Sequence, residues 1–289
     1  MPLSGPGIGL VYSRAHMPAR LPERIVCLTE ETTETLYLLG EERRIVGISG
    51  YTVRPPTARR EKPRVSSFLN AKQEKILELK PDLVLGFSDL QADIARDLAK
   101  AGLNVVLFNQ RSVEEILGVI QMLSALVGVP EKGAALVAGL EKNLLSIKEE
   151  AGKLPYRPRV YFEEWDEPMI SGIRWVSELV EIAGGRDVFK DLSLSQSAAG
   201  RTISEGKAVI EKNPEIIIGS WCGKKFRPER VAARPGWEAI AAVRDGELHE
   251  VKSSEILQPG PAALTDGVAR IAAIIKRAAG SAKGAPGGR

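Results

Sequence analysis

Histidine and cysteine are scarce in this chain of 289 residues, and their scarcity excludes several kinds of site. The two histidines, His16 and His249, lie far apart, so a histidine-rich metal site is excluded. The two cysteines, Cys27 and Cys222, are too few for a disulfide framework, although a single disulfide between them stays possible. We therefore expect no metal site and no required cofactor.

Long apolar runs are missing as well. No stretch approaches the roughly 18 consecutive apolar residues that a membrane-spanning helix needs. The N-terminal residues carry Gly and Pro where a signal peptide needs a positive end and an apolar run, and Met17 offers an alternative start. We expect a cytoplasmic protein from the sequence as written, or a periplasmic or cell-surface protein if the N-terminus is incomplete.

Motifs for nucleotide binding and hydrolysis are also lacking. "GSWCGKKF" (219–226) differs from a phosphate-binding loop in its glycine spacing and has Lys225 where a hydroxyl is needed. "GFSDL" (86–90) has Leu90 where a nucleophile elbow needs its second glycine. The net charge of +3 is mixed along the chain, with a basic bias only at the ends, so a nucleic-acid partner is not expected.

What the sequence does contain is a repeat of apolar strands that alternate with helices. "KPDLVLGFS" (80–88) and "NPEIIIGSW" (213–221) match one another, and the offset from Pro81 to Pro214 is 133 residues. The offset from Ile25 to Val160, in an earlier pair of strands, is 135. A nearly constant offset indicates a duplicated α/β lobe with a mostly parallel central sheet flanked by helices.

An amphipathic helix is predicted between the two lobes. Its apolar positions, at 137, 140, 144, 147 and 151, are spaced 3 and 4 residues apart, and its length is roughly 35 Å. Such a helix is a stiff connection. We predict a flexible extension (1–20), an N-terminal lobe (21–130), a linking helix (131–154), a C-terminal lobe (155–279) and a disordered tail (280–289), with a ligand cleft between the lobes.

Aromatic residues make up only 5% of the chain, and five of them follow the ends of predicted strands. Ligands of open α/β sheets bind beyond the carboxyl ends of the strands, so these side chains are candidates for the walls of one cleft. Packing against the core is the alternative, for Phe68 and Phe87 above all. The five are Tyr51, Phe68, Phe87, Trp165 and Trp221.

Polar groups near the same predicted strand ends are weaker candidates. Cys222 stands beside two lysines, whose charges are expected to lower the pKa of its thiol and raise its reactivity. A plain loop cysteine is the alternative that we favour. The ligand-binding candidates are Arg174, Cys222, Lys224 and Glu255, with Glu163, Glu164, Asp166, Lys225 and Gln258 nearby.

The order of these segments resembles the substrate-binding proteins of metal-chelate ABC importers, which bind cobalamin, haem or ferric siderophores. "RIVCLTEETTETLYLLG", "RIVGISGY", "KQEKILELKPDLVLG" and "SGIRWVSELVEIAGGRDVF" follow in the family's order, from about Arg20 to Ala279. The aromatic positions are most similar to those of the cobalamin-binding members. The resemblance therefore implies a monomeric, non-catalytic protein that binds a corrinoid between its lobes. A ferric-siderophore or haem binder, with Arg174 facing an anionic chelate, and a cytosolic corrinoid-handling enzyme are the alternatives.

The resemblance also implies docking to a membrane permease through one acidic residue on each lobe. Glu74 matches the family's position in the N-terminal lobe. In the C-terminal lobe the matching position is Gly206, and Glu205 precedes it by one residue, which turns a helical side chain by about 100°.

Overall fold

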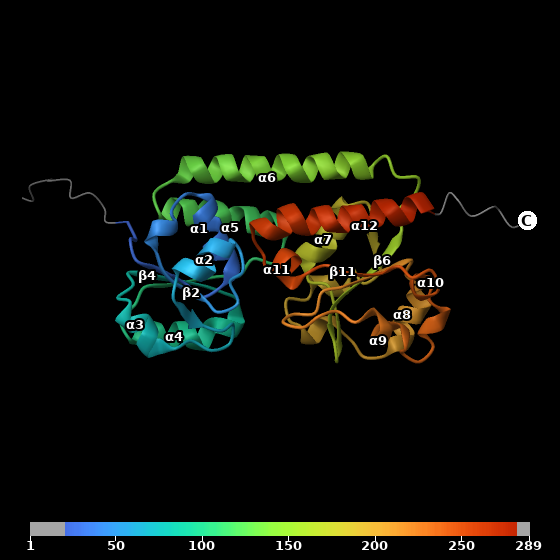
Figure 1. Ribbon diagram of the computed structural model, residues 1–289, viewed down its shortest axis with the longest axis horizontal. Helices are drawn as coiled ribbons and strands as arrows, with labels where there is room; N and C mark the ends of the chain where they lie inside the picture. Colours follow the sequence, from blue (N-terminus) through green and yellow to red (C-terminus); the bar gives the residue numbers. More distant parts are fainter. Residues whose placement is uncertain (1–20, 282–289) are drawn as a thin grey trace, which may run out of the picture.

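The computed structural model describes residues 21–281, so the predictions for residues 1–20 and 282–289 lie outside it. Two lobes lie side by side, and one long helix, α6 (Pro130–Ala151), runs along both of them (Figure 1). The predicted two-lobed α/β architecture with a long linking helix is confirmed. The last helix, α12, extends to Ser281, so Gly280 and Ser281 are helical where we predicted the start of a disordered tail.

The N-lobe is built on a five-stranded sheet in which all strands are parallel, in the order β3-β2-β1-β4-β5. The apolar side chains of β1 and of Leu28, which follows it, alternate between two clusters. Ile25 and Cys27 share one cluster with residues of α1 and α5, whereas Val26 and Leu28 share the other with residues of α3 and α4. The strands are β1 (Ile25–Cys27), β2 (Ile45–Ser49), β3 (Arg64–Ser66), β4 (Leu83–Phe87) and β5 (Val105–Phe108). The helices are α1 (Glu30–Leu38), α2 (Pro56–Glu61), α3 (Gln73–Glu78), α4 (Ala92–Lys100) and α5 (Val113–Leu126).

The C-lobe repeats this design with one change. Strands β11, β10 and β6 are parallel, whereas β7 pairs in the antiparallel sense with both β6 and β9, and β8 pairs with β6 in the parallel sense. The strands are β6 (Arg159–Asp166), β7 (Met169–Ser171), β8 (Arg186–Asp187), β9 (Thr202–Ile203), β10 (Ile216–Gly219) and β11 (Leu248–Glu250). The helices are α7 (Arg174–Ile182), α8 (Gly206–Lys212), α9 (Pro228–Ala232), α10 (Ala241–Arg244), α11 (Ser253–Ile256) and α12 (Val268–Ser281).

Short helical turns complete the two lobes. A π-helical turn at Ala263–Gly267 leads into α12, which lies between α6 and the C-lobe (Figure 1). The 3-10 turns are Glu42–Arg44, Asp89–Gln91, Leu192–Leu194, Ala199–Arg201 and Trp237–Ala239. No helix within residues 21–281 is long and apolar enough to cross a membrane.

The order of the N-lobe strands fixes where a ligand can bind. The connections leave β1 in one direction and β4 in the other, so the sheet order reverses between these two neighbours. A crevice forms beyond the carboxyl ends of the strands at such a reversal. Thr29 and Glu30 follow β1 at this point, and Ser88 follows β4.

Candidate functional site

A cavity of about 530 Å³ lies between the lobes, at the carboxyl edge of the N-lobe sheet. Its volume is in the range of small-molecule binding sites. We call it the inter-lobe cavity. Its N-lobe wall is formed by Thr29, Glu30, Ser49, Tyr51, Val53, Ser67, Phe68, Leu69 and Asn70, and its C-lobe wall by Cys222, Gly223, Ser253, Ser254 and Gln258.

The N-lobe wall carries the aromatic side chains. Tyr51 follows β2, where the Gly50 amide donates to the Ser66 carbonyl at 2.7 Å, and its side chain is 56% exposed. Phe68 follows β3 and is held by the buried Gln91, whose amide donates to the Phe68 carbonyl at 2.9 Å. The structure thus places these two predicted residues together on one wall.

Phe87 lies elsewhere, although it directly follows the repeated strand sequence. Its side chain is 7% exposed, belongs to the apolar core and has the Arg111 guanidinium 4.9 Å from its ring centre. Its backbone amide donates to the Gln91 side chain at 3.0 Å. Phe87 therefore packs in the core, which is the alternative that we weighed for it, and it does not line the cavity.

The two tryptophans predicted to line the cleft, Trp165 and Trp221, are also absent from the lining of the inter-lobe cavity. Trp221 is 2% exposed, and its indole N–H donates to Glu163 at 3.0 Å. The Trp165 indole donates to the Glu167 carbonyl at 2.9 Å, and the Lys224 ammonium lies 4.1 Å from the Trp165 ring centre. The C-lobe wall of the cavity is consequently polar, and the expected pair of opposed aromatic walls is not found among the described residues.

Gln258 lines the inter-lobe cavity, whereas three charged candidates are engaged in ion pairs. Arg174 pairs with Glu178 at 2.9 Å and lines a separate cavity beside α5. Glu255 pairs with Arg270 at 3.1 Å, and its neighbours Ser253 and Ser254 line the inter-lobe cavity in its place. Lys224 pairs with Asp166. Of the lining residues that the structure describes, none is lysine, arginine or histidine.

Cys222 lines the inter-lobe cavity, and its surroundings favour the plain loop cysteine that we preferred over an activated thiol. Burial raises the pKa of its thiol, and the charges of Glu164 and Glu30 raise it further. The neighbouring Lys224 is occupied with Asp166, and so it does not favour the thiolate. Both Cys222 and Cys27 are free thiols.

Glu30 is a site residue that the sequence analysis missed. Its side chain lines the inter-lobe cavity and is only 7% exposed, and the pKa of its carboxyl is raised to about 8. Burial is the main cause, the neighbouring Glu31 adds to it, and the Val53 backbone amide opposes it. The available signal was its position, directly after the first buried strand, where an acidic residue at a helix start is also expected for electrostatic reasons.

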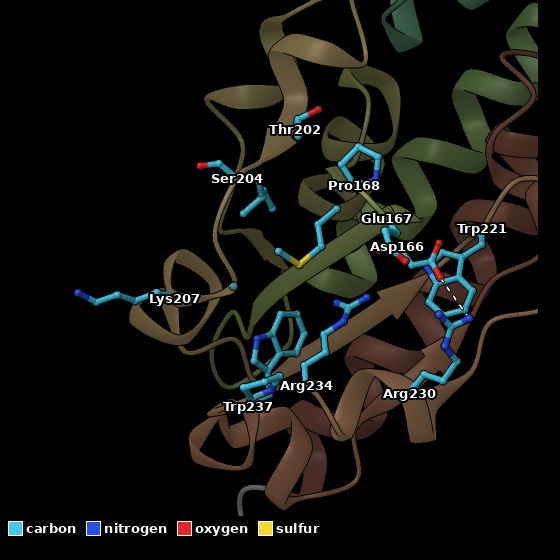
Figure 2. Close-up of a pocket in the computed structure, with 14 residues that line it drawn as sticks. Asp166, Glu167, Pro168, Thr202, Ser204, Lys207, Trp221, Arg230, Arg234 and Trp237 are labelled. Atoms are coloured by element: carbon cyan, nitrogen blue, oxygen red, sulfur yellow. Dashed lines mark ion pairs between the residues drawn. The ribbon is translucent and has the colours of Figure 1, made fainter.

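A second cavity, of about 570 Å³, lies within the C-lobe (Figure 2). The Arg230 guanidinium lies 3.6 Å from the Asp166 carboxylate. Burial alone would raise the pKa of Asp166, but the charges of Lys224 and Arg230 outweigh this effect, and the pKa is lowered. Beneath it, the buried Glu163 accepts hydrogen bonds from Arg234 at 2.9 Å and from Tyr161 at 2.9 Å. These charges satisfy one another, which is typical of a structural network.

The predicted docking residues lie at matching places on the two lobes. Glu74 is exposed in the first turn of α3, and Glu205 is the exposed residue that precedes α8. Both helices lie on the side of the molecule away from α6 (Figure 1). The Trp237 ring packs close to Gly206, and a Cβ at position 206 would lie 2.9 Å from the indole nitrogen. An acidic side chain is thus more easily accommodated at 205 than at 206.

Comparison with known proteins settles the family. The family model described as periplasmic binding protein matches residues 25–255. The chain belongs to this family. It is 26% identical over 87% of its length to the uncharacterized ABC transporter substrate-binding lipoprotein YvrC of Bacillus subtilis, covering 79% of that protein. It is 24% identical over 80% of its length to a vitamin B12-binding protein of Yersinia pseudotuberculosis, covering 81% of that protein.

Solved structures of periplasmic binding proteins share the fold. A possible iron-binding protein of Staphylococcus epidermidis matches with a TM-score of 0.77 and 23% identity, over 89% of this chain and 99% of that one. The vitamin B12 binding protein BtuF of Vibrio cholerae matches with a TM-score of 0.70 and 23% identity, over 89% of this chain and 98% of that one. The haem-binding protein RhuT of Roseiflexus sp. RS-1 matches with a TM-score of 0.76 and 21% identity, over 89% of this chain and 99% of that one. The resemblance to substrate-binding proteins of ABC importers is thereby confirmed.

Proposed function

We propose that the protein binds a corrinoid of the cobalamin type in the inter-lobe cavity, without acting on it chemically. The observation that carries this proposal is a cavity with Tyr51 and Phe68 on one wall and small polar groups on the other. A corrin is flat and largely apolar, so it suits an aromatic wall, and its amide side arms can hydrogen-bond to polar loop residues. Curated relatives named as vitamin B12-binding proteins support this ligand.

A ferric-siderophore or haem ligand is the second candidate, because solved structures of the same fold are named for iron and haem. Anionic chelates are usually met by cationic side chains. The lining residues described here include no such side chain, and Arg174 lies in a different cavity. The lining residues therefore favour the corrinoid.

Delivery to an ABC importer is the second part of the proposal. Glu74 and Glu205 are exposed at the starts of equivalent helices on the side away from α6, where both could contact one membrane partner at once. We propose a monomer that presents this face to a permease. A corrinoid-handling enzyme has less support, since Cys222 carries a thiol of raised pKa.

Isothermal titration with cyanocobalamin, haemin and a ferric hydroxamate siderophore tests the ligand. We expect micromolar or tighter binding of cyanocobalamin alone, and a loss of about tenfold or more in affinity in the double variant Tyr51→Ala/Phe68→Ala, because the aromatic wall supplies most of the apolar contact. Tyr156→Ala removes an exposed aromatic side chain that is not among the lining residues, so it serves as the matched control and should bind normally. Binding of haemin or the siderophore with no binding of cyanocobalamin overturns the proposal.

A further inference from the structure

Glu30 occupies an unusual position in the inter-lobe cavity. It is the first residue of α1, it lines the cavity, and 93% of its surface is covered by protein, since its exposure is 7%. Its Oε2 has no hydrogen-bond partner among the described residues. A buried carboxyl oxygen without a partner is costly in free energy, and because the Glu30 side chain lines the cavity, a ligand group bound there can supply a hydrogen bond to the carboxyl.

The charges around Glu30 decide what kind of partner fits. Glu31 and Glu34 face it from α1, Arg54 from the loop before α2 and Cys222 from the C-lobe. Arg54 is itself bound to Glu34 at 2.9 Å and to Asp266 at 2.8 Å. Arg54, the cation among these groups, is thus already paired with two carboxylates, so a carboxylate on the ligand would find no free cation among them.

The protonation of Glu30 makes it both a donor and an acceptor. Because burial raises the pKa of Glu30 to about 8, the carboxyl is largely neutral at pH 7. A neutral carboxyl has an O–H donor and a carbonyl acceptor side by side. A primary amide presents the complementary pair, so the two groups can join through two parallel hydrogen bonds.

Building on the proposed function, we propose that Glu30 determines specificity by binding a primary-amide side arm of the corrinoid. Its carboxyl accepts from the amide N–H and donates to the amide carbonyl. The cavity thereby selects corrinoids with amidated arms over those with free carboxylates. No bond of the ligand is made or broken, and Ser253, Ser254 and Gln258 on the opposite wall are placed to receive other polar groups.

Titration with two corrinoids tests this inference. Dicyanocobinamide has amidated side arms, and dicyanocobyrinic acid has carboxylates in their place. We expect the unaltered protein to prefer dicyanocobinamide by at least about tenfold. Glu30→Leu fills a similar volume but removes the hydrogen-bond donor and acceptor. In this variant the affinity for dicyanocobinamide should fall about tenfold, equivalent to about 1.4 kcal/mol. The affinity for dicyanocobyrinic acid should not fall.

Two further variants sharpen the result. Glu30→Gln keeps a donor and an acceptor and should retain dicyanocobinamide affinity to within about threefold. Glu149→Gln, an exposed carboxyl on α6, is the matched control and should change neither affinity. If the preference is unchanged in Glu30→Leu, or absent from the unaltered protein, the inference is wrong while corrinoid binding stands. If neither corrinoid binds, the proposed function fails with it. Should Glu30→Leu not fold, loss of the preference in Glu30→Gln contradicts the inference by itself.

Discussion

Buried carboxyl groups at the start of α1 connect the stability of this protein to pH. Burial raises the pKa of Glu30 to about 8 and that of Glu31 to about 7, from an ordinary value of 4.5. Thr29 donates a hydrogen bond to Glu31 and partly opposes this shift. Between pH 4.5 and 8 the folded protein therefore holds protons that the unfolded chain has already lost, and its stability falls as the pH rises through that window.

Replacing Glu31 should remove part of this pH dependence. Glu31→Gln has no carboxyl to ionise at this position. From pH 5 to pH 8.5 we therefore expect the free energy of unfolding to fall by about 1–3 kcal/mol less in the variant than in the unaltered protein. Urea unfolding at both pH values measures the difference. The exposed Glu149→Gln should show no such gain, and an equal response of the two variants would contradict the pKa assignment.

Single residues also show where sequence reasoning reaches its limit. Tyr51 and Phe68 lie on the cavity wall, whereas Phe87 and Trp221 follow strands in the same way and yet turn into the core. At a strand end, a change of one residue reverses the direction of the side chain. For Trp221 the direction is fixed by the distant Glu163, a contact that no local pattern predicts.

At the scale of elements, apolar runs and their flanking glycines were informative. The sequences of β4 and β10 predicted two parallel strands, and the stripe on residues 137–151 predicted helix α6. The antiparallel strand β7 and the helix α5 were not among the predicted elements. The pairing of β7 with β6 is a hairpin contact that depends on tertiary structure, and β7 is only three residues long.

The contact between α1 and the loop before α12 depends on Gly260. A Cβ at this position would lie 2.5 Å from the Glu31 Cβ and 3.2 Å from its Cα, so the loop or the helix must move. We expect Gly260→Ala to cost about 1–3 kcal/mol of stability, as overpacking usually does, and to weaken ligand binding because α1 carries Glu30. Thermal unfolding and the cyanocobalamin titration measure the two effects.

Gly139, within α6, provides the control for this prediction. A Cβ there meets nothing within 4 Å, so Gly139→Ala should stabilise the protein by about 0.5–1 kcal/mol through better helix propensity. If Gly139→Ala and Gly260→Ala changed the stability by the same amount, the close approach of the loop to α1 would not contribute to the stability of the protein.

At the scale of the whole molecule, several contacts hold the two lobes in one arrangement. The Ala262 amide donates to Glu34 at 3.0 Å, and the Gln110 side chain donates to the Pro259 carbonyl at 3.0 Å. Arg54 pairs with Asp266 across the same boundary at 2.8 Å. Helix α6 packs on α5 of the N-lobe and on α7 and α12 of the C-lobe. A cleft bounded in this way is formed before the ligand arrives.

Ligand binding should accordingly leave the lobes almost where they are. Spin labels at Lys75→Cys in the N-lobe and Glu211→Cys in the C-lobe, both exposed positions, report the separation by pulsed electron paramagnetic resonance once Cys222 is replaced by serine. We expect the mean distance to change by less than about 2 Å at saturating cyanocobalamin, as in pre-organised complexes. Adding Arg54→Ala removes the link to both Glu34 and Asp266, so the distance distribution should broaden in the absence of ligand. A shift of several ångströms in the protein with Arg54 intact would mean that the lobes close by a hinge. In that case either α6 bends or the contacts at Pro259, Ala262 and Asp266 break when the ligand binds.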